Sequence, residues 1–478
     1  MRLVLILFLS LSIVPIQAWA FCGFFVSGAD SKLYNDASQV VLMRKGNRTV
    51  MSMSNNYKGP AADFAMVVPV PVVLQEEQVK TLAPNVFDKV DQLSAPRLVE
   101  YWEKDPCYRP PNRFMYKLSS AMSGGDQVMM EMSAVDDLGV TVEAKFSVGE
   151  YDIVILSAKE ANGLDTWLRR NKYSIPEGAA DALAPYIREE MKFFVAKVNI
   201  KKVKRGVGGV VVLSPLRFDF EAPTLRLPVR LGLLNAQGKQ DLLVYVLHDK
   251  SRFEAANYKN VFIPSNLEVE NSVRERFGEF YTAVFDATLE KAGGKAVITE
   301  YAWQTTSCDP CPVPPLQPQD LYTLGGDVLT ENPKVKAQKI GSPQRGMPFF
   351  GNFSSWVLTR MHTRYSKDTL SEDLVFVEAG PVRGGRGSAG ASLEQPGSVE
   401  PARVNNFQGR YIIRHYWEGP VKCENPVYGR WGGPPKGSQD TQAATNLAGA
   451  KRGGVKLNDS VRSNLPQLAI PGKASPSR

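Results

Sequence analysis

The chain has 478 residues, of which 43% are apolar, 10% aromatic and 22% charged. This balance is typical of a protein with a folded core, and it excludes a collagen-like chain, a wholly disordered chain and a polytopic membrane protein. The 57 Lys and Arg residues exceed the 49 Asp and Glu residues, so the formal net charge is +8. Only three histidines are present, which argues against a histidine-rich metal site and against catalysis by several histidines.

Residues 1–20 have the pattern of a secretory signal peptide. Arg2 supplies the positive start, an apolar run extends to Ile16, and Ala18 and Ala20 provide the small residues of a signal-peptidase site. The apolar run is shorter than the roughly 20 residues that a membrane-spanning helix needs. We therefore expect cleavage near Ala20 and an exported mature protein, periplasmic or extracellular, without a transmembrane anchor.

The body of the chain, residues 21–380, is patterned mainly as β-hairpins. Runs of β-branched and apolar residues alternate with turns that contain Gly, Asn or Pro. The predicted strands cover residues 39–44, 48–53, 64–73, 141–146, 151–156, 194–200, 225–234, 241–248, 296–303, 356–365, 374–377 and 410–417.

Few segments of the body have helical periodicity. A helix is predicted for residues 161–170, and a second helical region follows it, with Ser174 and Glu177 spaced as a capping box and Pro185 dividing it in two. A further helix is predicted for residues 273–289, where apolar residues recur every three or four positions. Many hairpins and few helices predict an α+β fold with mainly antiparallel β-hairpins. We expect one domain or two interleaved subdomains.

The composition changes after the body. Residues 381–403 are rich in Gly, Ser and Pro and are expected to be a flexible insertion, residues 404–431 the last ordered block of the same domain, and residues 432–478 a disordered basic tail. Residues 381–478 hold 14 Lys and Arg against six Asp and Glu, whereas residues 21–380 hold 42 against 43. The positive charge therefore belongs to the C-terminal part, and no nucleic-acid partner is expected for the body.

Five cysteines remain after removal of the signal peptide, and export would place them in an oxidising compartment. An odd number leaves at least one thiol without a partner in the same chain, and the sequence does not decide among the pairings. These candidate disulfide or thiol residues are Cys22, Cys107, Cys308, Cys311 and Cys423.

Two of the cysteines form a Cys-x-x-Cys motif, Cys308-Asp309-Pro310-Cys311. One interpretation is a thiol–disulfide oxidoreductase site, which needs a following helix whose N-terminus lowers the thiol pKa. Three prolines between residues 312 and 315 force extended backbone and remove that helix, so a structural bridge is favoured. A zinc site needs four ligands, usually from two such pairs, and only one pair is present.

No other motif identifies a catalytic or cofactor site. Metalloprotease, nucleophile-elbow and Walker motifs are absent, and the Gly-rich residues 205–209 open no helix, as a dinucleotide-binding loop would. His248, His362 and His415 lie on or at the end of predicted strands, where structural histidines are the default interpretation. The catalytic residues are thus unknown, and neither a cofactor nor a metal is expected.

Several blocks of the sequence resemble those of one bacterial family. They are Cys22-Gly23-Phe24-Phe25 and residues 37–41, 64–71, 94–101, 148–153, 191–197, 300–303, 308–311 and 406–411. The blocks are similar to domain-of-unknown-function family 2330. The resemblance implies an exported bacterial protein with no established activity, cofactor or catalytic residue. It also suggests that the five cysteines belong to the family's pattern, which favours a disulfide framework.

Together these observations favour a non-enzymatic envelope binding or structural protein, because a well-patterned body carries no assembled catalytic motif. Its expected partner is an envelope component or polysaccharide, since Trp303, Tyr416 and Trp417 offer rings for stacking on sugars, although core packing is the commoner role. One alternative is a periplasmic thiol–disulfide oxidoreductase that uses Cys308 and Cys311. Another is adhesion to an anionic polymer through the basic tail, residues 432–478.

Overall fold

The computed structural model describes much of the chain between residues 24 and 473. The predicted signal peptide, Cys22 and residues 385–396 of the predicted insertion lie outside the described residues. The described residues are 24–27, 34–35, 38–54, 57–58, 64–108, 139–171, 173, 175, 177–203, 213–235, 239–329, 356–366, 369, 372–384, 397, 399–434, 441–443 and 452–473.

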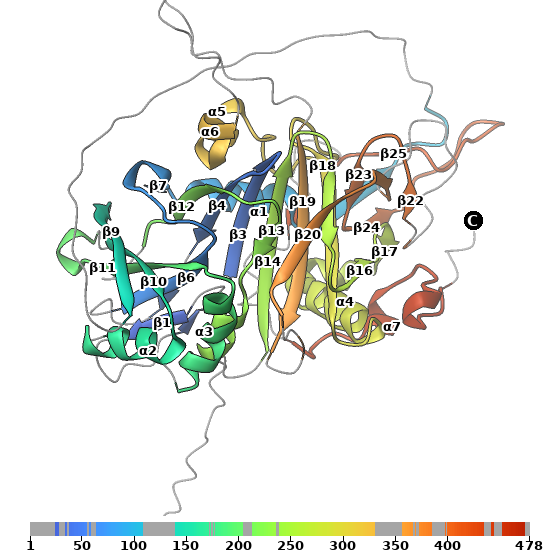
Figure 1. The fold of residues 1–478 in the computed structure, drawn as a ribbon. Coiled ribbons are helices and arrows are strands. Elements are labelled where there is room, and N and C mark those ends of the chain that lie inside the picture. Colours follow the sequence, from blue (N-terminus) through green and yellow to red (C-terminus); the bar gives the residue numbers. More distant parts are fainter. Residues whose placement is uncertain are drawn as a thin grey trace, which may run out of the picture.

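A large β-sheet of eleven strands forms the centre of the fold (Figure 1). Most neighbouring strands are antiparallel, but β14 runs parallel to β3. In spatial order its strands are β22 (Glu400–Pro401), β21 (Val382–Arg383), β23 (Asn406–Gln408), β18 (Ala296–Gln304), β19 (Val357–Tyr365), β14 (Gln240–His248), β3 (Ser38–Lys45), β4 (Arg48–Ser54), β12 (Leu216–Glu221) and β7 (Val79–Thr81), and β16 (Lys259–Phe262) pairs with β18.

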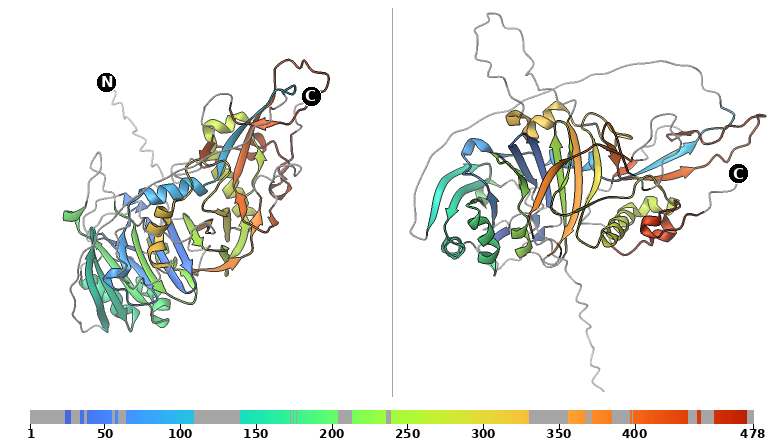
Figure 2. Two further views of the ribbon diagram at one scale, coloured as in Figure 1. Left: turned by 90° about the horizontal axis from the view of Figure 1, so that it is seen from above. Right: turned by 45° about the vertical axis from the view of Figure 1, so that its right-hand side comes forward.

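A second, antiparallel sheet packs on one face of the large sheet, and two helices cover its outer side (Figures 1 and 2). Leu164 and Leu183 of these helices pack against Phe193 and Val195 of the sheet. The elements are β1 (Phe24–Ser27), β6 (Phe64–Val70), β11 (Lys192–Val198), β10 (Tyr151–Ala158), β9 (Val140–Val148), α2 (Ala161–Arg170) and α3 (Ala179–Arg188).

The opposite face of the large sheet is covered by helix α4 (Phe277–Lys291). Strand β14 explains how one sheet serves two cores, because successive side chains of a strand point to opposite faces. Leu242 and Val244 join the core shared with the second sheet, whereas Leu243 and Tyr245 join the core shared with α4. All nine residues of β14 are buried, as expected for a central strand that is covered on both sides.

Smaller elements complete the fold. A five-stranded sheet beyond α4 joins β8 to β24 in parallel. The remaining elements are α1 (Asn85–Ser94), α5 (Pro318–Leu321), α6 (Asp327–Leu329), α7 (Leu457–Ser460), β17 (Leu267–Glu268), β24 (Arg410–His415), β8 (Arg97–Glu103), β25 (Trp431–Gly432), β26 (Thr441–Ala443), β13 (Leu225–Leu227), β20 (Leu374–Ala379), β15 (Arg252–Ala255), β2 (Tyr34–Asn35) and β5 (Tyr57–Lys58).

The predicted α+β class is confirmed, and so is the disulfide framework. Many antiparallel strands alternate with a few helices, and two bridges join Cys107 to Cys423 and Cys308 to Cys311. The predicted helix 273–289 is present as α4, preceded by a 3-10 turn. No helix in the described part of the chain is long and apolar enough to cross a membrane.

The C-terminal prediction is wrong for residues 452–473, which were expected to belong to a disordered tail. This segment, here called the C-terminal strap, contains α7 and lies beside α4 (Figure 2). Val461, Leu465 and Ile470 are buried in the same core cluster as α4. Three apolar residues spaced along a short polar segment are too weak a pattern to predict an ordered structure. The strap is ordered because it docks on the apolar surface of the body.

The predicted insertion, residues 381–403, also has ordered ends. Strands β21 and β22 lie at its two ends and pair with each other, and β21 continues the large sheet through β23. The boundaries inferred from the Gly- and Pro-rich composition are therefore too wide on both sides.

Candidate functional site

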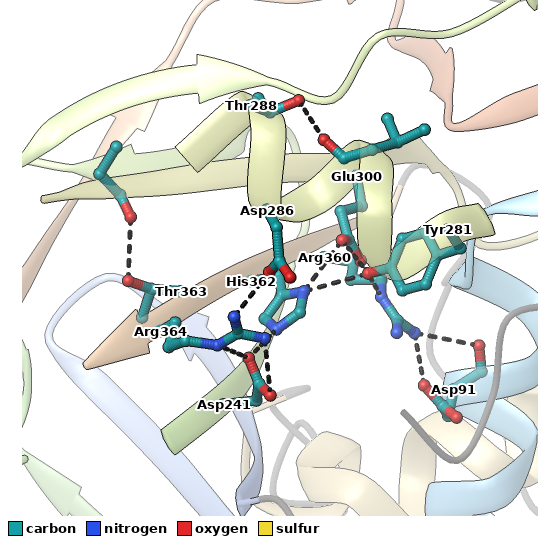
Figure 3. A network of polar contacts seen from close by, with 12 residues as sticks. Asp91, Asp241, Tyr281, Asp286, Thr288, Glu300, Arg360, His362, Thr363 and Arg364 are labelled. Atoms are coloured by element: carbon teal, nitrogen blue, oxygen red, sulfur yellow. Dashed lines mark hydrogen bonds and ion pairs between the residues drawn. The ribbon is translucent and has the colours of Figure 1, made fainter. Parts of the chain in front are cut away.

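A chain of charged side chains runs through the core between the large sheet and α4 (Figure 3). Strand β19 contributes Arg360, His362 and Arg364, which share one face because side chains two residues apart point the same way. Strand β14 contributes Asp241, and β18 contributes Glu300.

Glu300 lies at an irregularity of β18. The pairing of β18 with β19 shifts between Thr299 and Tyr301, so Glu300 is the extra residue of a β-bulge. Bulges change the direction of a side chain relative to the regular strand. Here the carboxylate of the bulged residue, Glu300, contacts Arg360 and His362 of β19.

Arg360 is the inner cation of this network. Its Nε donates to Glu300 Oε2 at 2.7 Å, and its Nη1 donates to Asp91 Oδ1 of α1 at 2.5 Å. The hydroxyl of Tyr245 donates to the same Asp91 oxygen at 2.7 Å. Arg360 and Glu300 are completely buried. A buried guanidinium is tolerated because two carboxylates compensate its charge.

His362 lies between two carboxylates. Its Nδ1 is 3.1 Å from Glu300 Oε1, and its Nε2 is 3.1 Å from Asp241 Oδ1. The ring of Phe285 stacks on the imidazole with 3.7 Å between the ring centroids, and Tyr281 donates its hydroxyl to Glu300. This geometry provides an acceptor for each ring nitrogen, which favours the protonated imidazolium.

The electrostatics of His362 agree with this geometry. Burial alone would lower the pKa of His362, but the carboxylates of Glu300 and Asp241 raise it above its ordinary value. Burial likewise acts to raise the pKa values of Glu300 and Asp241, yet the contacts with His362 and with Arg360 or Arg364 lower both. The three groups therefore stabilise one another as ions.

The outer end of the network is closed by two arginines. Arg364 Nε donates to Asp241 Oδ1 at 2.9 Å, and Arg452 Nη2 of the C-terminal strap donates to Asp241 Oδ2 at 2.9 Å. Both arginines also donate to Asp286 of α4. Asp241 consequently keeps only 2% of its surface exposed. The strap thus completes the charge balance of the core.

This network has the residue types of acid–base catalysis but the geometry of a structural element. Glu300, His362 and Asp241 are at most 2% exposed, so no substrate reaches them. The nitrogens of His362 and the oxygens that it contacts are already occupied by protein partners. We conclude that it stabilises the packing of β14, β18 and β19 against α4.

The other two histidines lie elsewhere. His415 Nε2 is 2.7 Å from Glu100 Oε2, and its ring stacks on Trp102 with 4.4 Å between the centroids. His248 accepts the backbone N–H of Ser251 at 3.0 Å and packs edge-on against Phe253, and burial lowers its pKa despite the nearby carboxylates of Glu378 and Asp249. The three histidines do not meet in one site, and each belongs to its own local contacts.

The Cys107–Cys423 bridge ties the segment after β8 to the segment after β24. Its Cα atoms are 5.6 Å apart, although 316 residues separate the two cysteines in sequence. Glu103 supports the same connection by accepting the backbone N–H groups of Trp417 and Gly429 at 3.1 and 2.6 Å. The bridge thus holds an irregular loop against the end of β8.

The Cys308–Cys311 bridge closes the Cys-x-x-Cys motif on itself, with 5.0 Å between the Cα atoms. Cys308 is half-buried and packs against the core, whereas Cys311 is exposed. No helix follows until α5 begins at Pro318, as the proline run predicted. The motif is therefore a closed turn on the surface rather than the start of a helix.

Two buried side chains hold this turn from below. Arg97 Nη1 donates to the carbonyl oxygen of Pro310 at 2.5 Å, and Gln408 Nε2 donates to that of Asp309. Arg97 and Gln408 are both completely buried. Sequence reasoning found the motif but missed these two residues, because they come from β8 and β23, which are distant in sequence.

A metal site is not evident in the described part of the chain. There, no group of three or more His, Cys, Asp or Glu side chains is arranged to hold an ion. Of the aromatic residues considered as sugar platforms, Trp303 is buried in the core beside Tyr301. Tyr416 is half-buried. It packs edge-on against Trp431 and donates its hydroxyl to Glu268.

Comparison with protein families places these features in a wider group. The profile of a family described as "uncharacterized protein conserved in bacteria (DUF2330)" matches residues 16–377. The chain belongs to this family. The DUF2330 match includes Glu300, His362 and the Cys308–Cys311 pair, whereas Cys423 and the C-terminal strap lie beyond it. Searches among curated proteins and among solved structures found no match.

Proposed function

We propose that this DUF2330 protein is an exported, non-enzymatic envelope protein with a binding or structural role. One observation carries the proposal: the residue types that commonly serve in acid–base catalysis are buried in the core. Glu300, His362, Asp241 and Arg360 form a closed, charge-balanced network that substrate cannot enter. The signal-peptide pattern and two disulfide bridges support export, because disulfides persist in oxidising compartments.

The loop around the Cys107–Cys423 bridge is the best candidate for contact with an envelope polysaccharide. Among the described residues, eight large apolar side chains are exposed, and four of them, Tyr108, Val421, Val427 and Tyr428, lie next to this bridge. Exposed rings on a covalently fixed loop can stack on sugars at a low cost in side-chain entropy. The proposed partner class is therefore a polysaccharide of the envelope.

Export is tested by cell fractionation of the full chain and of a variant that lacks residues 2–20. The full chain is expected outside the cytoplasm, with a mature N-terminus at Phe21, whereas the variant is expected in the cytoplasm with reduced cysteines. A full-length, uncleaved protein in the cytoplasm would contradict the proposal.

Binding is tested by co-sedimentation of the mature protein with purified cell-wall polysaccharide. The double variant Tyr108→Ala, Tyr428→Ala should bind several-fold less, since each lost stacking contact is worth about 1 kcal/mol. Tyr322→Ala is the matched control, because Tyr322 is equally exposed but lies elsewhere. Turnover of any substrate in a panel of chromogenic hydrolase substrates would contradict the non-enzymatic role.

Adhesion to an anionic polymer through the tail now has less support. Arg452, Arg462 and Lys473 of the C-terminal strap pair with carboxylates of the body, so their charges are already compensated. Deletion of residues 432–478 remains the direct test, with loss of salt-sensitive binding expected only if the tail is the adhesive part.

A second candidate function is thiol–disulfide exchange at Cys308 and Cys311. One observation favours it: Cys311 is exposed in a bridge that joins only these two neighbouring cysteines. An accessible sulfur is the first requirement for exchange with another thiol.

A further inference from the structure

Arg97 is a completely buried cation. Its Nη1 donates to the carbonyl oxygen of Pro310 and its Nη2 to that of Leu93, both at 2.5 Å. Within the described part of the chain, no Asp or Glu forms an ion pair with Arg97, although the Asp309 carboxylate acts on it at longer range. Its Nε has no hydrogen-bond partner there either. The guanidinium also lies 5.9 Å from the centroid of the Tyr301 ring. The Nη1 end of the guanidinium therefore faces the backbone of the Cys308–Cys311 turn.

Arg97 nevertheless stays charged at neutral pH. Burial lowers the pKa of Arg97 to about 10, which is still well above 7. A full positive charge in the low-dielectric interior acts strongly on groups within a few ångströms. Pro310, whose carbonyl Arg97 contacts, is flanked in sequence by Asp309 and by Cys311. The cation therefore lies against the closed turn itself.

The two sulfurs of the turn have different surroundings. Cys308 is half-buried and packs against the core, whereas Cys311 is exposed. Arg97 is completely buried and meets the same turn at the carbonyl oxygen of Pro310, so it approaches the turn from the inner side. Gln408 fixes the same turn through the carbonyl oxygen of Asp309. An incoming thiol can thus reach Cys311, and the sulfur that leaves would be Cys308, on the buried side.

We propose that the Cys308–Cys311 bridge exchanges with dithiols of exported proteins, and that the charge of Arg97 stabilises the Cys308 thiolate. This inference rests on the second candidate function. Positive charge beside a cysteine lowers its thiol pKa and makes it a better leaving group. Arg97 thereby supplies what the missing helix dipole supplies in other Cys-x-x-Cys sites.

The exchange balances without a further reactant. One thiolate of the substrate dithiol bonds to Cys311 Sγ, and the Cys308–Cys311 bond breaks with its electron pair on Cys308. The second substrate thiolate then attacks the substrate sulfur of the mixed disulfide and releases Cys311. The substrate loses two electrons and becomes a disulfide, the Cys308–Cys311 pair gains them, and the two thiol protons pass to the pair or to solvent.

The exchange itself is tested with the mature protein carrying Cys22→Ser and a reduced peptide that contains two cysteines. Mass mapping is expected to show oxidised peptide and reduced Cys308 and Cys311, with the Cys107–Cys423 bridge intact as the internal control. Cys311→Ser should abolish the reaction. If the peptide reduces neither bridge, or reduces Cys107–Cys423 at the same rate, the second candidate function is wrong.

The role of Arg97 is tested on the reduced protein by the pH dependence of Cys308 alkylation with iodoacetamide. Arg97→Gln should raise the pH midpoint by about one unit, which corresponds to a tenfold lower thiolate fraction near neutral pH. Arg97→Lys should restore most of the effect. Gln408→Leu is the matched control, because it removes a donor to the same turn without removing a charge, and it should leave the midpoint nearly unchanged.

A further variant keeps the test decisive if Arg97→Gln does not fold. Asp309→Asn removes the negative charge nearest to the turn and should increase alkylation of Cys308 about threefold near neutral pH. An unchanged midpoint in Arg97→Gln would overturn the role of Arg97 while leaving the exchange reaction standing. Asp309 is adjacent to Cys308 in sequence, so an unchanged rate in Asp309→Asn would show that charge at the turn does not act on the Cys308 thiolate, which overturns the role of Arg97 as well.

Discussion

Arg360 and Arg97 are both completely buried in the same protein, yet their surroundings differ in kind. Arg360 donates to the carboxylates of Glu300 and Asp91, whereas Arg97 donates to two carbonyl oxygens and lies over the ring of Tyr301. A buried charge that is paired contributes mainly to packing and specificity. A buried charge without an ion-pair partner acts more strongly on other groups, and Arg97 contacts the backbone of the Cys308–Cys311 turn.

The largest expected effect is a difference in the free energy of unfolding between variants of the two arginines. Arg360→Met leaves two buried carboxylates without their cation and should lower the free energy of unfolding by about 3–5 kcal/mol. Arg97→Met leaves only two carbonyl oxygens unsatisfied and should cost about 1–3 kcal/mol. Urea unfolding of the oxidised protein, followed by tryptophan fluorescence, measures both. An equal loss of unfolding free energy in both variants would contradict the proposed difference between the two arginines.

The next effect concerns pH. Glu300 and Asp241 have lowered pKa values, so their contribution is present above their unfolded pKa values, about 4, and is lost as the pH falls. His362 has a raised pKa, so its contribution is complete below its ordinary value of 6.5 and is lost as the pH rises through the folded value. Stability should therefore be highest between about pH 5 and 6.5.

The control for the alkaline limb is His362→Gln. This variant is expected to be less stable throughout, but its stability should no longer decline between pH 6.5 and 9, since the titrating group is gone. Thermal unfolding across that pH range distinguishes the outcomes. An unchanged decline in the variant would assign the alkaline limb to another group.

The smallest effect concerns the outer end of the network. Arg452→Gln removes one of the donors to Asp241 but leaves Arg364 and His362 in place, so it should cost about 1 kcal/mol. Hydrogen exchange should also increase in the C-terminal strap. The matched control is Arg383→Gln, which breaks the exposed pair with Glu400 and should change stability by less than about 0.5 kcal/mol.

Much of the fold was predictable because it depends on local patterns. The predicted strand at 241–248 corresponds to β14, and the strand at 151–156 lies within β10. The parallel pairing of β14 with β3 was not predictable, because partners in a parallel pair are joined by long connections that leave no local signal. The strap was missed for a related reason, since it is ordered only by the surface on which it docks.

The sites were predictable only in part. Arg360, His362 and Arg364 alternate along an otherwise buried strand, and this pattern would have indicated a polar face turned into the core. Their carboxylate partners come from β14, β18 and α1, so the sequence could not join them. The Cys-x-x-Cys motif was visible, but Arg97 is contributed by a strand more than 200 residues earlier in the chain.

The parallel pairing of β8 with β24 has a consequence for how the protein is made. Tyr101 and Arg410 meet in this sheet although 309 residues separate them. Because synthesis proceeds from the N-terminus, β8 waits with an unpaired edge while most of the chain is still being added. Unpaired edges are templates for wrong association between chains. The last hundred residues therefore close the fold, and a chain interrupted before β24 would leave β8 open to aggregation.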